Sequence, residues 1–324
     1  MDRMLPTPVL EIGGTHVTAA LVQEQASGWT VRAGSTIRRD LDAHGTAADL
    51  LDTLAGAANA LGSGHNGQWG VALPGPFDYV NGIALYEDVG KFDHLHGVDV
   101  RAGLLARLRP VPKRITFLND ADAFGIGEFA VGAAGSSRRG ACITLGTGVG
   151  SAAFLADGVP VKTGNDVPPD GSCYLLEYRN RPLEETVSRR AVRRAYAAAK
   201  GLAPAEPGAQ GTHDAEGPDV RGIAEASRAG DAVAAAVLEY AFAAVGEAAG
   251  PYLQRFGAEV LIVGGSMAGS WDIVEPALRR GLAAAAQGLA ALPIRKAERS
   301  GEAGLIGAAY WAGRTASPSP GQRP

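Results

Sequence analysis

The sequence has few cysteines, few aromatic residues and no marked excess of charge. Only Cys142 and Cys173 occur among 324 residues, too few for a disulfide framework or a thiolate zinc cage. Acidic residues number 34 and basic residues 30, which gives a net charge of -4. The basic residues form no dense stripe of the kind that neutralises a phosphate backbone. These scarcities argue against a disulfide-rich secreted domain and against a nucleic-acid partner.

Long hydrophobic runs are also missing. No run reaches the 18 or so consecutive apolar residues of a membrane span, and residues 1–14 lack an apolar core followed by a small-residue cleavage site. We therefore predict a cytoplasmic protein with no membrane partner. Hydrophobic residues make up 46% and charged residues 20% of the chain, the ordinary balance of globular proteins. The length favours two domains.

Glycine is abundant, with 45 residues, and three glycine turns each follow an apolar segment typical of a strand. The turns are residues 13–15, 146–148 and 264–266. Without side chains, backbone N–H groups can approach an anion closely, so three such turns indicate a polyphosphate ligand. Each turn alone is equally typical of a structural hairpin. Neither the Walker motif nor GxGxxG after the first strand is present, which excludes the P-loop and Rossmann interpretations.

The spacing of apolar residues predicts alternating strands and helices, and therefore an α/β fold. The predicted strands are 9–12, 17–22, 69–73, 115–118, 141–145, 151–155 and 260–263, of which the first two form a hairpin. The predicted helices are 49–61, 100–108, 119–132, 220–228, 231–256 and 302–311. The Pro-, Gly- and Ala-rich composition of residues 201–219 predicts a mobile surface loop, and residues 313–324 are predicted to form a disordered tail.

Two carboxylates stand next to predicted strand ends. Phosphoryl transfer requires phosphate-binding loops, a magnesium ion held by a carboxylate, and a base that takes the proton of the acceptor hydroxyl. Glu11, just before the first glycine turn, is placed to hold the metal through water. Asp120, at the next strand-to-helix junction, is placed to act as the base. The alternatives are a helix N-cap for Asp120 and a solvated strand-end carboxylate for Glu11.

Six segments resemble the motifs of the ROK family (repressor, open reading frame, kinase), whose sugar kinases belong to the actin-like ATPase superfamily. The segments are VLEIGGTHVTAALV, GVALPGPFDYVNG, FLNDADAFGIGE, CITLGTGVGSAAFLADG, LIVGGSMAGSWDIVEPAL and EAGLIGAAYWA, and together they extend from about residue 9 to residue 312. The resemblance implies two actin-like (ribonuclease H-like) domains with the active site in the cleft between them. It also implies ATP and Mg2+ as cofactors and a sugar as substrate.

The resemblance assigns roles to individual positions. Asp120 would be the general base, with Asn119 on a sugar hydroxyl and Pro74 and Gly75 in the sugar-side loop. The ATP phosphates would be contacted by Gly13, Gly14, Thr15, Gly146, Thr147 and Gly148, and adenosine by Gly264, Gly265 and Ser266. A smaller first domain would comprise residues 1–118 and the closing helix at about 302–312, and a larger second domain residues 119–301. Members often form dimers, so a homodimer is expected, although the sequence shows no interface.

The first phosphate loop departs from the family pattern at two positions. Glu11 stands where the family has aspartate, and His16 where it has lysine. Glutamate keeps the charge and adds one methylene, so metal binding is retained as an expectation. The segment after Gly158 also lacks the Glu-x-Gly-His pair that grips hexose hydroxyls and the zinc-binding cysteines that many members carry. We therefore expect no structural zinc.

Other polar residues are candidates for the altered sugar side. Glu184 lies in PLEETVSRRAV, which resembles a family segment that carries a sugar contact, and Asp166 or Asn165 is a candidate for the space of the lost histidine. The segment after the PGP loop offers Glu87, Asp88 and Lys91. A solvated loop explains these last three residues equally well.

The sequence thus favours an ATP-dependent kinase of a primary hydroxyl. A hexose 6-kinase is the family default, but unpaired buried polar groups cost about 1–3 kcal/mol each, so the altered pocket also suggests a C7-cyclitol 7-kinase. One alternative is a DNA-binding repressor, which would need a helix-turn-helix ahead of a phosphate loop that begins here by residue 11. A second alternative is a sugar-binding pseudokinase or sensor without turnover, against which Asn119 and Asp120 argue.

Overall fold

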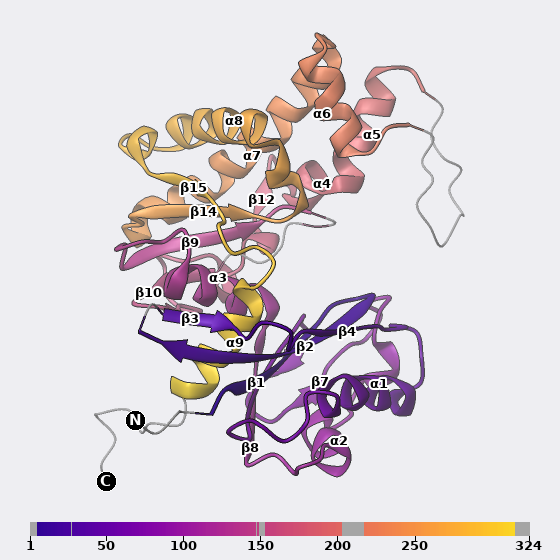
Figure 1. Ribbon diagram of the computed structural model, residues 1–324. Helices are drawn as coiled ribbons and strands as arrows, with labels where there is room; N and C mark the ends of the chain where they lie inside the picture. The colour runs from indigo at the N-terminus through magenta and orange to yellow at the C-terminus, as the bar shows by residue number, and fades with distance from the viewer. Residues whose placement is uncertain (1–4, 27, 147, 149–152, 203–216, 315–324) are drawn as a thin grey trace. The chain divides into compact units, whose positions relative to one another are not determined.

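The computed structural model describes residues 5–26, 28–146, 148, 153–202 and 217–314. It divides into two compact units (Figure 1). The first unit is Met1–Gly132 with Arg299–Pro324, and the second is Ala133–Glu298. Each unit combines a sheet with helices, so the predicted α/β class is confirmed.

A mixed sheet forms the centre of the first unit, in the order β3-β2-β1-β5-β8, with β4 also paired to β2. The strands are β1 (Thr7–Ile12), β2 (His16–Gln25), β3 (Gly28–Val31), β4 (Ile37–Asp40), β5 (Gln68–Leu73) and β8 (Arg114–Asn119). β1 runs antiparallel to β2 and parallel to β5, and β5 runs parallel to β8. The predicted hairpin is confirmed. β3 and β4 were not predicted because they contain no buried residue and so lack the apolar run that marks a core strand.

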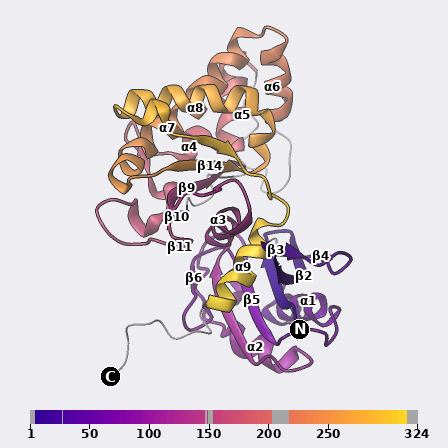
Figure 2. The ribbon, with the colours of Figure 1, turned by 60° about the vertical axis from the view of Figure 1, so that its left-hand side comes forward.

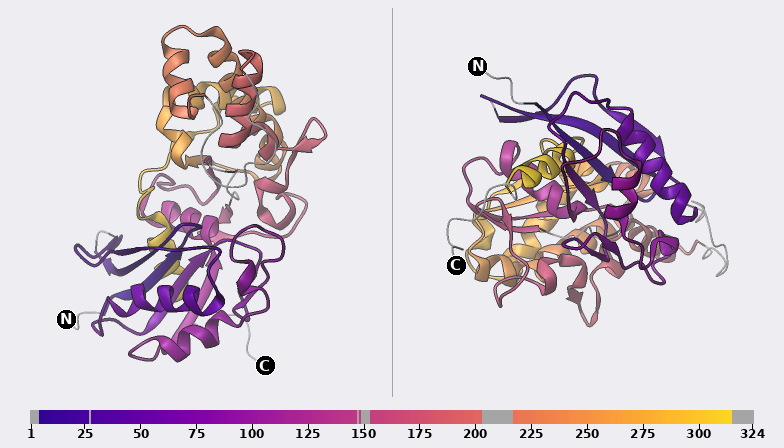
Figure 3. Two further views of the ribbon diagram at one scale, coloured as in Figure 1. Left: turned by 90° about the vertical axis from the view of Figure 1, so that its right-hand side faces the viewer. Right: turned by 90° about the horizontal axis from the view of Figure 1, so that it is seen from below.

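Alternate residues of β1 face two different layers, as the two-residue period of a strand requires. Leu10 and Ile12 belong to a hydrophobic core that includes Leu50 and Leu54. Leu50 and Leu54 lie on α1, and residues of α2 belong to the same core. Both helices therefore cover the face of the sheet that carries Leu10 and Ile12 (Figure 3). The helices are α1 (Ala47–Asn59) and α2 (Val100–Arg107).

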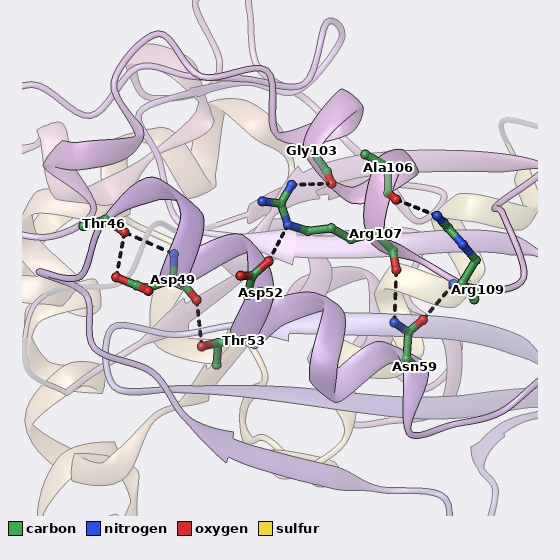
Figure 4. A network of polar contacts seen from close by, with 9 residues as sticks. All are labelled: Thr46, Asp49, Asp52, Thr53, Asn59, Gly103, Ala106, Arg107 and Arg109. Atoms are coloured by element: carbon green, nitrogen blue, oxygen red, sulfur yellow. Dashed lines mark hydrogen bonds and ion pairs between the residues drawn. The ribbon is translucent and has the colours of Figure 1, made fainter.

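Polar contacts join α1 to α2 (Figure 4). Asn59 donates to the carbonyl of Arg107 at 3.1 Å and accepts from the N–H of Arg109 at 2.8 Å. Asp52 pairs with Arg107 at 2.6 Å between Oδ1 and Nε. Because Asp52 is exposed, the ion pair adds less than about 1 kcal/mol. The amide of Asn59 fixes the path of the chain from α2 toward β8.

Two helices from distant parts of the sequence cover the other face of the sheet and pack against each other (Figure 2). They are α3 (Asp120–Val131) and α9 (Ala303–Arg314). Their close approach requires glycine: a Cβ atom at Gly127 would lie 2.0 Å from the carbonyl oxygen of Ala303, and one at Gly307 would lie 1.8 Å from that of Ala123. The backbones of the two helices are therefore in direct contact.

The sheet of the second unit has the order β11-β10-β9-β14-β15. Its strands are β9 (Arg139–Thr144), β10 (Ala153–Ala156), β11 (Val159–Pro160), β14 (Val260–Gly264) and β15 (Ile294–Lys296). β10 is antiparallel to both β9 and β11, while β9, β14 and β15 run parallel. Three antiparallel strands followed by two parallel ones repeat the path β3-β2-β1-β5-β8 of the first unit. Such a repeated topology is that of paired actin-like domains.

The helices of the second unit are α4 (Glu184–Val187), α5 (Arg189–Ala199), α6 (Val220–Arg228), α7 (Ala232–Phe256) and α8 (Trp271–Ala285). α7 is long and apolar enough to cross a membrane, judged by length and composition alone. The sequence analysis did not find this helix, because Glu239 and Glu247 interrupt its apolar run. Its buried residues, Leu238 and Phe242 among them, lie in the core of the unit, and α7 packs against α8. This is the packing of a core helix.

The boundaries of the two compact units differ from the boundary expected between residues 118 and 119. The divisions follow Gly132 and Glu298, because α3 packs against α9 in the first unit. Residues 313 and 314 form the end of α9. The rest of the predicted tail, 315–324, and residues 203–216 of the predicted loop lie outside the described residues.

Candidate functional site

The carboxyl ends of β1, β5 and β8 lie side by side at one edge of the first sheet. Glu11 of β1 is in register with Ala72 of β5, and the last residue of β5 is in register with Asn119 of β8. Open α/β sheets bind ligands at this edge. The structure therefore brings together three predicted features: the metal-binding Glu11, the loop at Pro74 and the Asn119–Asp120 pair.

A cavity of about 450 Å³ opens at this edge. It is lined by Glu11, Ile12, Gly13, His16, Thr18, Thr36, Arg38, Asp120, Ser300, Gly301, Glu302 and Leu305. Both predicted functional carboxylates thus face one cavity, together with the start of the first glycine turn. The N–H group of Gly13 donates to the carbonyl of His16 at 2.9 Å, which closes the turn. Gly14 and Thr15 are exposed at its tip.

Glu11 is an unusual carboxylate because its pKa is raised to about 7. Burial is the main cause and the charge of Asp120 adds to it, whereas Arg38 acts in the opposite direction. Glu11 is in register with Thr18, which is in register with Arg38, so all three lie on one face of the sheet. A nearby cation would favour the charged form of Glu11.

The donor set around Glu11 fits Mg2+ better than a metal that needs a full protein cage. The described residues contain no group of three or more His, Cys, Asp or Glu side chains that could hold a metal ion. Mg2+ usually takes one or two carboxylates and completes its shell with water and substrate phosphates. Glu11 would supply the carboxylate beside the phosphate-binding turn.

Asp120 is the first residue of α3, and its pKa is also raised, mainly by burial. The N–H of Ala121, which donates to Oδ1 at 2.9 Å, and the charge of Lys91 partly offset the effect of burial. The N-cap alternative for Asp120 is wrong, because Asn119 caps the helix and accepts from the N–H groups of Ala121 and Asp122. Asp120 keeps a carboxylate oxygen for a ligand, and a raised pKa makes it a better proton acceptor.

Tyr79 fixes the orientation of Asn119, a role that the sequence did not reveal. Nδ2 of Asn119 donates to the Tyr79 hydroxyl at 3.1 Å, and that hydroxyl donates to the carbonyl of Leu73 at 3.3 Å. Gly75 lies beside the same hydroxyl, since a Cβ atom there would be 3.4 Å from it. Tyr79 stands within the quoted segment GVALPGPFDYVNG, but only the fold shows that its ring returns to Asn119.

A second tyrosine also holds the predicted sugar-side loop. The buried hydroxyl of Tyr86 donates to the carbonyl of Pro74 at 2.6 Å. The pKa of Tyr86 is raised, mainly by burial and then by Tyr79 and Asp120. The predicted loop at Pro74 and Gly75 is thus fixed by two phenols next to the predicted base.

The three candidates after this loop differ in position. The stem of Lys91 lies 3.9 Å from where a Cβ atom of Gly14 would be, and its charge lowers the pKa of Asp120. The structure therefore places Lys91 between the first glycine turn and the predicted base. Glu87 and Asp88 are exposed and form no hydrogen bond or ion pair with the described residues, as the solvated-loop alternative expects.

The other two glycine turns pack against each other in the second unit. The N–H of Leu145 donates to the carbonyl of Gly264 at 3.0 Å, and the N–H of Met267 donates to the carbonyl of Leu145 at 3.1 Å. Gly265 has φ 84°, and a Cβ atom there would lie 2.3 Å from the carbonyl oxygen of Leu145. Glycine is therefore required at this position. Thr147 of the neighbouring turn lies outside the described residues.

Glu184 lies against the second phosphate turn. A Cβ atom at Gly148 would be 3.0 Å from its Oε1. The N–H of Gly146 donates to the carbonyl of Gly148 at 3.1 Å, and the carbonyl of Gly146 accepts from the N–H of Arg189 at 3.0 Å. The predicted sugar-side glutamate and the predicted phosphate turn are therefore neighbours.

A second cavity, of about 600 Å³, adjoins these turns within the second unit. It is lined by Arg189, Asp219, Val220, Arg221, Glu225, Arg228, Ser266, Met267, Gly269 and Ser270. Arg189 donates to the hydroxyl of Ser266 at 3.3 Å. Of the three residues predicted beside adenosine, Ser266 lines this cavity, while Gly264 and Gly265 precede it in the same turn.

Asp166 is not at the phosphate turn. Its carboxylate pairs with Arg139 at 3.7 Å, and Asn165 accepts from Arg255 through its carbonyl. Arg139 begins β9, whereas Gly146 follows its end, and a strand rises about 3.3 Å per residue. Asp166 therefore lies near the opposite end of β9 from Gly146, and its role in place of the lost histidine stays a prediction.

These two units, each with the repeated strand topology and a glycine turn after its first strand, define a two-domain protein of the actin-like fold. The sequence pattern of the ROK family matches residues 8–315. The chain therefore belongs to the ROK family.

Individual relatives agree with this family. The glucokinase of Thermotoga maritima is 25% identical over 279 residues, which cover 83% of this chain and 84% of that protein. The crystal structure of a ROK family glucokinase from Streptomyces griseus, in complex with glucose and AMPPNP, has a TM-score of 0.69 at 23% identity and covers 95% of this chain and 99% of its own. A ROK family transcriptional regulator has a TM-score of 0.73 at 19% identity, covering 95% of this chain and 78% of its own.

Proposed function

We propose that this protein is an ATP- and Mg2+-dependent kinase that phosphorylates a primary hydroxyl of a sugar or a sugar-like cyclitol. The observation that carries the proposal is the cavity of the first unit, where Glu11 and Asp120 meet the first glycine turn. Asn119 and the tyrosine-bound loop at Pro74 stand next to Asp120. Relatives that are named glucokinases support the same reaction class.

In this proposal each residue has one task. Asp120 accepts the proton of the acceptor hydroxyl, whose oxygen attacks the γ-phosphorus as the bond to the β–γ bridging oxygen breaks and ADP leaves. Asn119 orients the acceptor, and Glu184 is a candidate contact to an acceptor hydroxyl. Mg2+, held by Glu11 through water, would neutralise charge on the phosphates. The turns at Gly13–Thr15 and Gly146–Gly148 would bind the phosphates through backbone N–H groups.

The acceptor is the finer part of the proposal. The glutamate-histidine pair of the family is missing after Gly158, and the ion pair of Asp166 with Arg139 does not favour Asp166 as its replacement. Lys91 adds a cation near Asp120. A changed set of polar groups selects a changed hydroxyl pattern, so we include C7-cyclitols with hexoses as candidate acceptors. A cytoplasmic location and a homodimer stay predictions.

A sugar-binding pseudokinase or sensor is the second candidate. A regulator with the same fold covers 95% of this chain, so the fold does not separate the two functions. The retention of Asn119 and Asp120 beside the cavity that holds Glu11 favours the enzyme, because a pure binding site needs no base.

The experiment is sugar-dependent ADP release from MgATP by the purified chain, across hexoses, N-acetylhexosamines and C7-cyclitols. Turnover on a hexose supports the hexose kinase, and turnover restricted to cyclitols supports the cyclitol kinase. Measurable binding of ATP without turnover on any member of the panel would support the pseudokinase instead.

A further inference from the structure

The carboxylate of Glu11 lies directly against Gly304, the second residue of α9. A Cβ atom at Gly304 would lie 2.3 Å from Oε1, 2.9 Å from Cδ and 3.5 Å from Oε2 of Glu11. The first two distances are shorter than any normal contact of a Cβ atom. Gly304 is buried. The end of the glutamate side chain thus occupies the space that any other residue at position 304 would fill.

The helix cannot retreat to make room for a side chain. One turn beyond Gly304, a Cβ atom at Gly307 would lie 1.8 Å from the carbonyl oxygen of Ala123 in α3. On the sheet side, a Cβ atom at Gly70 of β5 would lie 2.2 Å from the carbonyl oxygen of Ala308. α9 is therefore in backbone contact with both α3 and β5.

The backbone of Glu11 is held as well, so a side chain at position 304 would be accommodated by a shift of the flexible carboxylate toward the cavity. The strand of Glu11 is paired on both sides, with β2 and with β5, and the face of β1 that carries Glu11 lies under α9. The first turn of a helix carries partial positive charge, which favours a carboxylate at this place. Moving Glu11 away would change its distance from Asp120, which lines the same cavity.

We propose that Gly304 is a positioning residue for Glu11: the absence of a side chain at position 304 gives the long carboxylate its place beside Asp120. The inference rests on the proposed function for its effect on catalysis. It also explains how a glutamate works where the family pattern has the shorter aspartate. Positions 11 and 304 are then coupled, since a shorter acid at position 11 reduces the need for glycine at position 304.

The test is a double-mutant cycle of Gly304→Ala, Glu11→Asp and the combined variant, with Gly313→Ala as the matched control in the same helix. A Cβ atom at Gly313 meets only Trp29, at 3.9 Å. We expect Gly304→Ala to lower kcat about 100-fold, because displacement of a catalytic group by about 1 Å has effects of this size. Glu11→Asp alone should cost about 10-fold, as weakened metal ligation does. Gly313→Ala should keep wild-type activity.

The combined variant distinguishes coupled from independent effects of the two substitutions on kcat. Aspartate ends one bond earlier, so its carboxylate can turn away from the new methyl group, and we expect kcat to return to about the level of Glu11→Asp. Independent effects would instead multiply to a loss of roughly 1,000-fold. A loss of that size, or wild-type activity in Gly304→Ala, would overturn the proposal.

Thermal unfolding of the unliganded variants reports on the contact without turnover. Alanine normally stabilises a helix relative to glycine, so Gly313→Ala should leave Tm unchanged or raise it. Gly304→Ala should gain less than Gly313→Ala or lose stability, because the new methyl group displaces the carboxylate of Glu11, and Glu11→Asp should reduce this difference. If the wild type releases no ADP, the proposed function fails while this cycle still tests the contact. A gain in Tm in Gly304→Ala equal to that in Gly313→Ala, unaffected by Glu11→Asp, would overturn the contact itself.

Discussion

Asn119 donates a hydrogen bond of 3.1 Å to the hydroxyl of Tyr79 while its side-chain oxygen caps α3. One amide thereby joins the sugar-side loop to the helix that begins with Asp120. Replacement of Tyr79 by phenylalanine leaves Nδ2 of Asn119 without this acceptor, at a cost of about 1 kcal/mol. We expect kcat/KM for the acceptor to fall about 10-fold and the KM for ATP to stay unchanged, as steady-state kinetics would show. An equal rise in both KM values would contradict this role.

Glu184 and Asp166 are two carboxylates of the second unit that serve as test position and control position. Glu184 touches the turn at Gly148, whereas Asp166 pairs with Arg139 at the other end of β9. Glu184→Gln should raise the KM for the acceptor about 10-fold, since a hydrogen bond to a charged group contributes about 1.5–3 kcal/mol. Asp166→Asn should leave KM within about twofold, because it loses only an exposed ion pair. Reversed effects would place the acceptor at Asp166.

The raised pKa of Glu11 makes the stability of the unliganded protein depend on pH. Its pKa is about 7 in the fold and 4.5 in the reference state, so the folded form binds the proton more tightly. The stability from this group is fully present below pH 4.5 and is lost as pH rises through 7. Tm of the wild type should therefore decline between these values more steeply than Tm of Glu11→Gln. Parallel curves for the two proteins would show that Glu11 titrates normally.

Arg38 and Arg39 are adjacent in β4 but lie on opposite faces of the sheet. Arg38 shares a row with Glu11 and lowers its pKa, whereas Arg39 packs over Gly56 of α1, 2.6 Å from where a Cβ atom would be. Arg38→Ala should raise the pKa of Glu11 further, so the acidic limb of the pH–kcat/KM profile moves to higher pH. Arg39→Ala is the control and should leave the limb in place. A shift in both variants would point to net charge as the cause.

The sequence predicted the elements that carry the site because their apolar patterns are long. The hairpin before and after Gly13 and the helix that follows Asn119 both match the structure. Local patterns also placed Glu11 and Asp120 at strand ends, which parallel pairing brings to one edge. What local patterns could not supply were contacts between distant segments. Tyr79 lies 40 positions from Asn119.

Asp166 shows the limit of assigning a role by position along a motif. The sequence placed it where a family contact is missing, whereas in the structure its carboxylate pairs with Arg139 near the far end of β9. The coupling of Glu11 to Gly304 is hidden for a related reason, since α9 returns to β1 from the other end of the chain. Packing against a distant backbone has no signature in local spacing.

The most direct test of the account is single-turnover ADP formation by the wild type and Asp120→Asn with saturating MgATP and the best acceptor of the panel. Asparagine preserves the size of the side chain and cannot act as the base, so we predict a rate about 100-fold to 10,000-fold lower with ATP binding unchanged. A variant that retains the wild-type rate would contradict the assignment of Asp120 as the general base, and with it the central claim about this site.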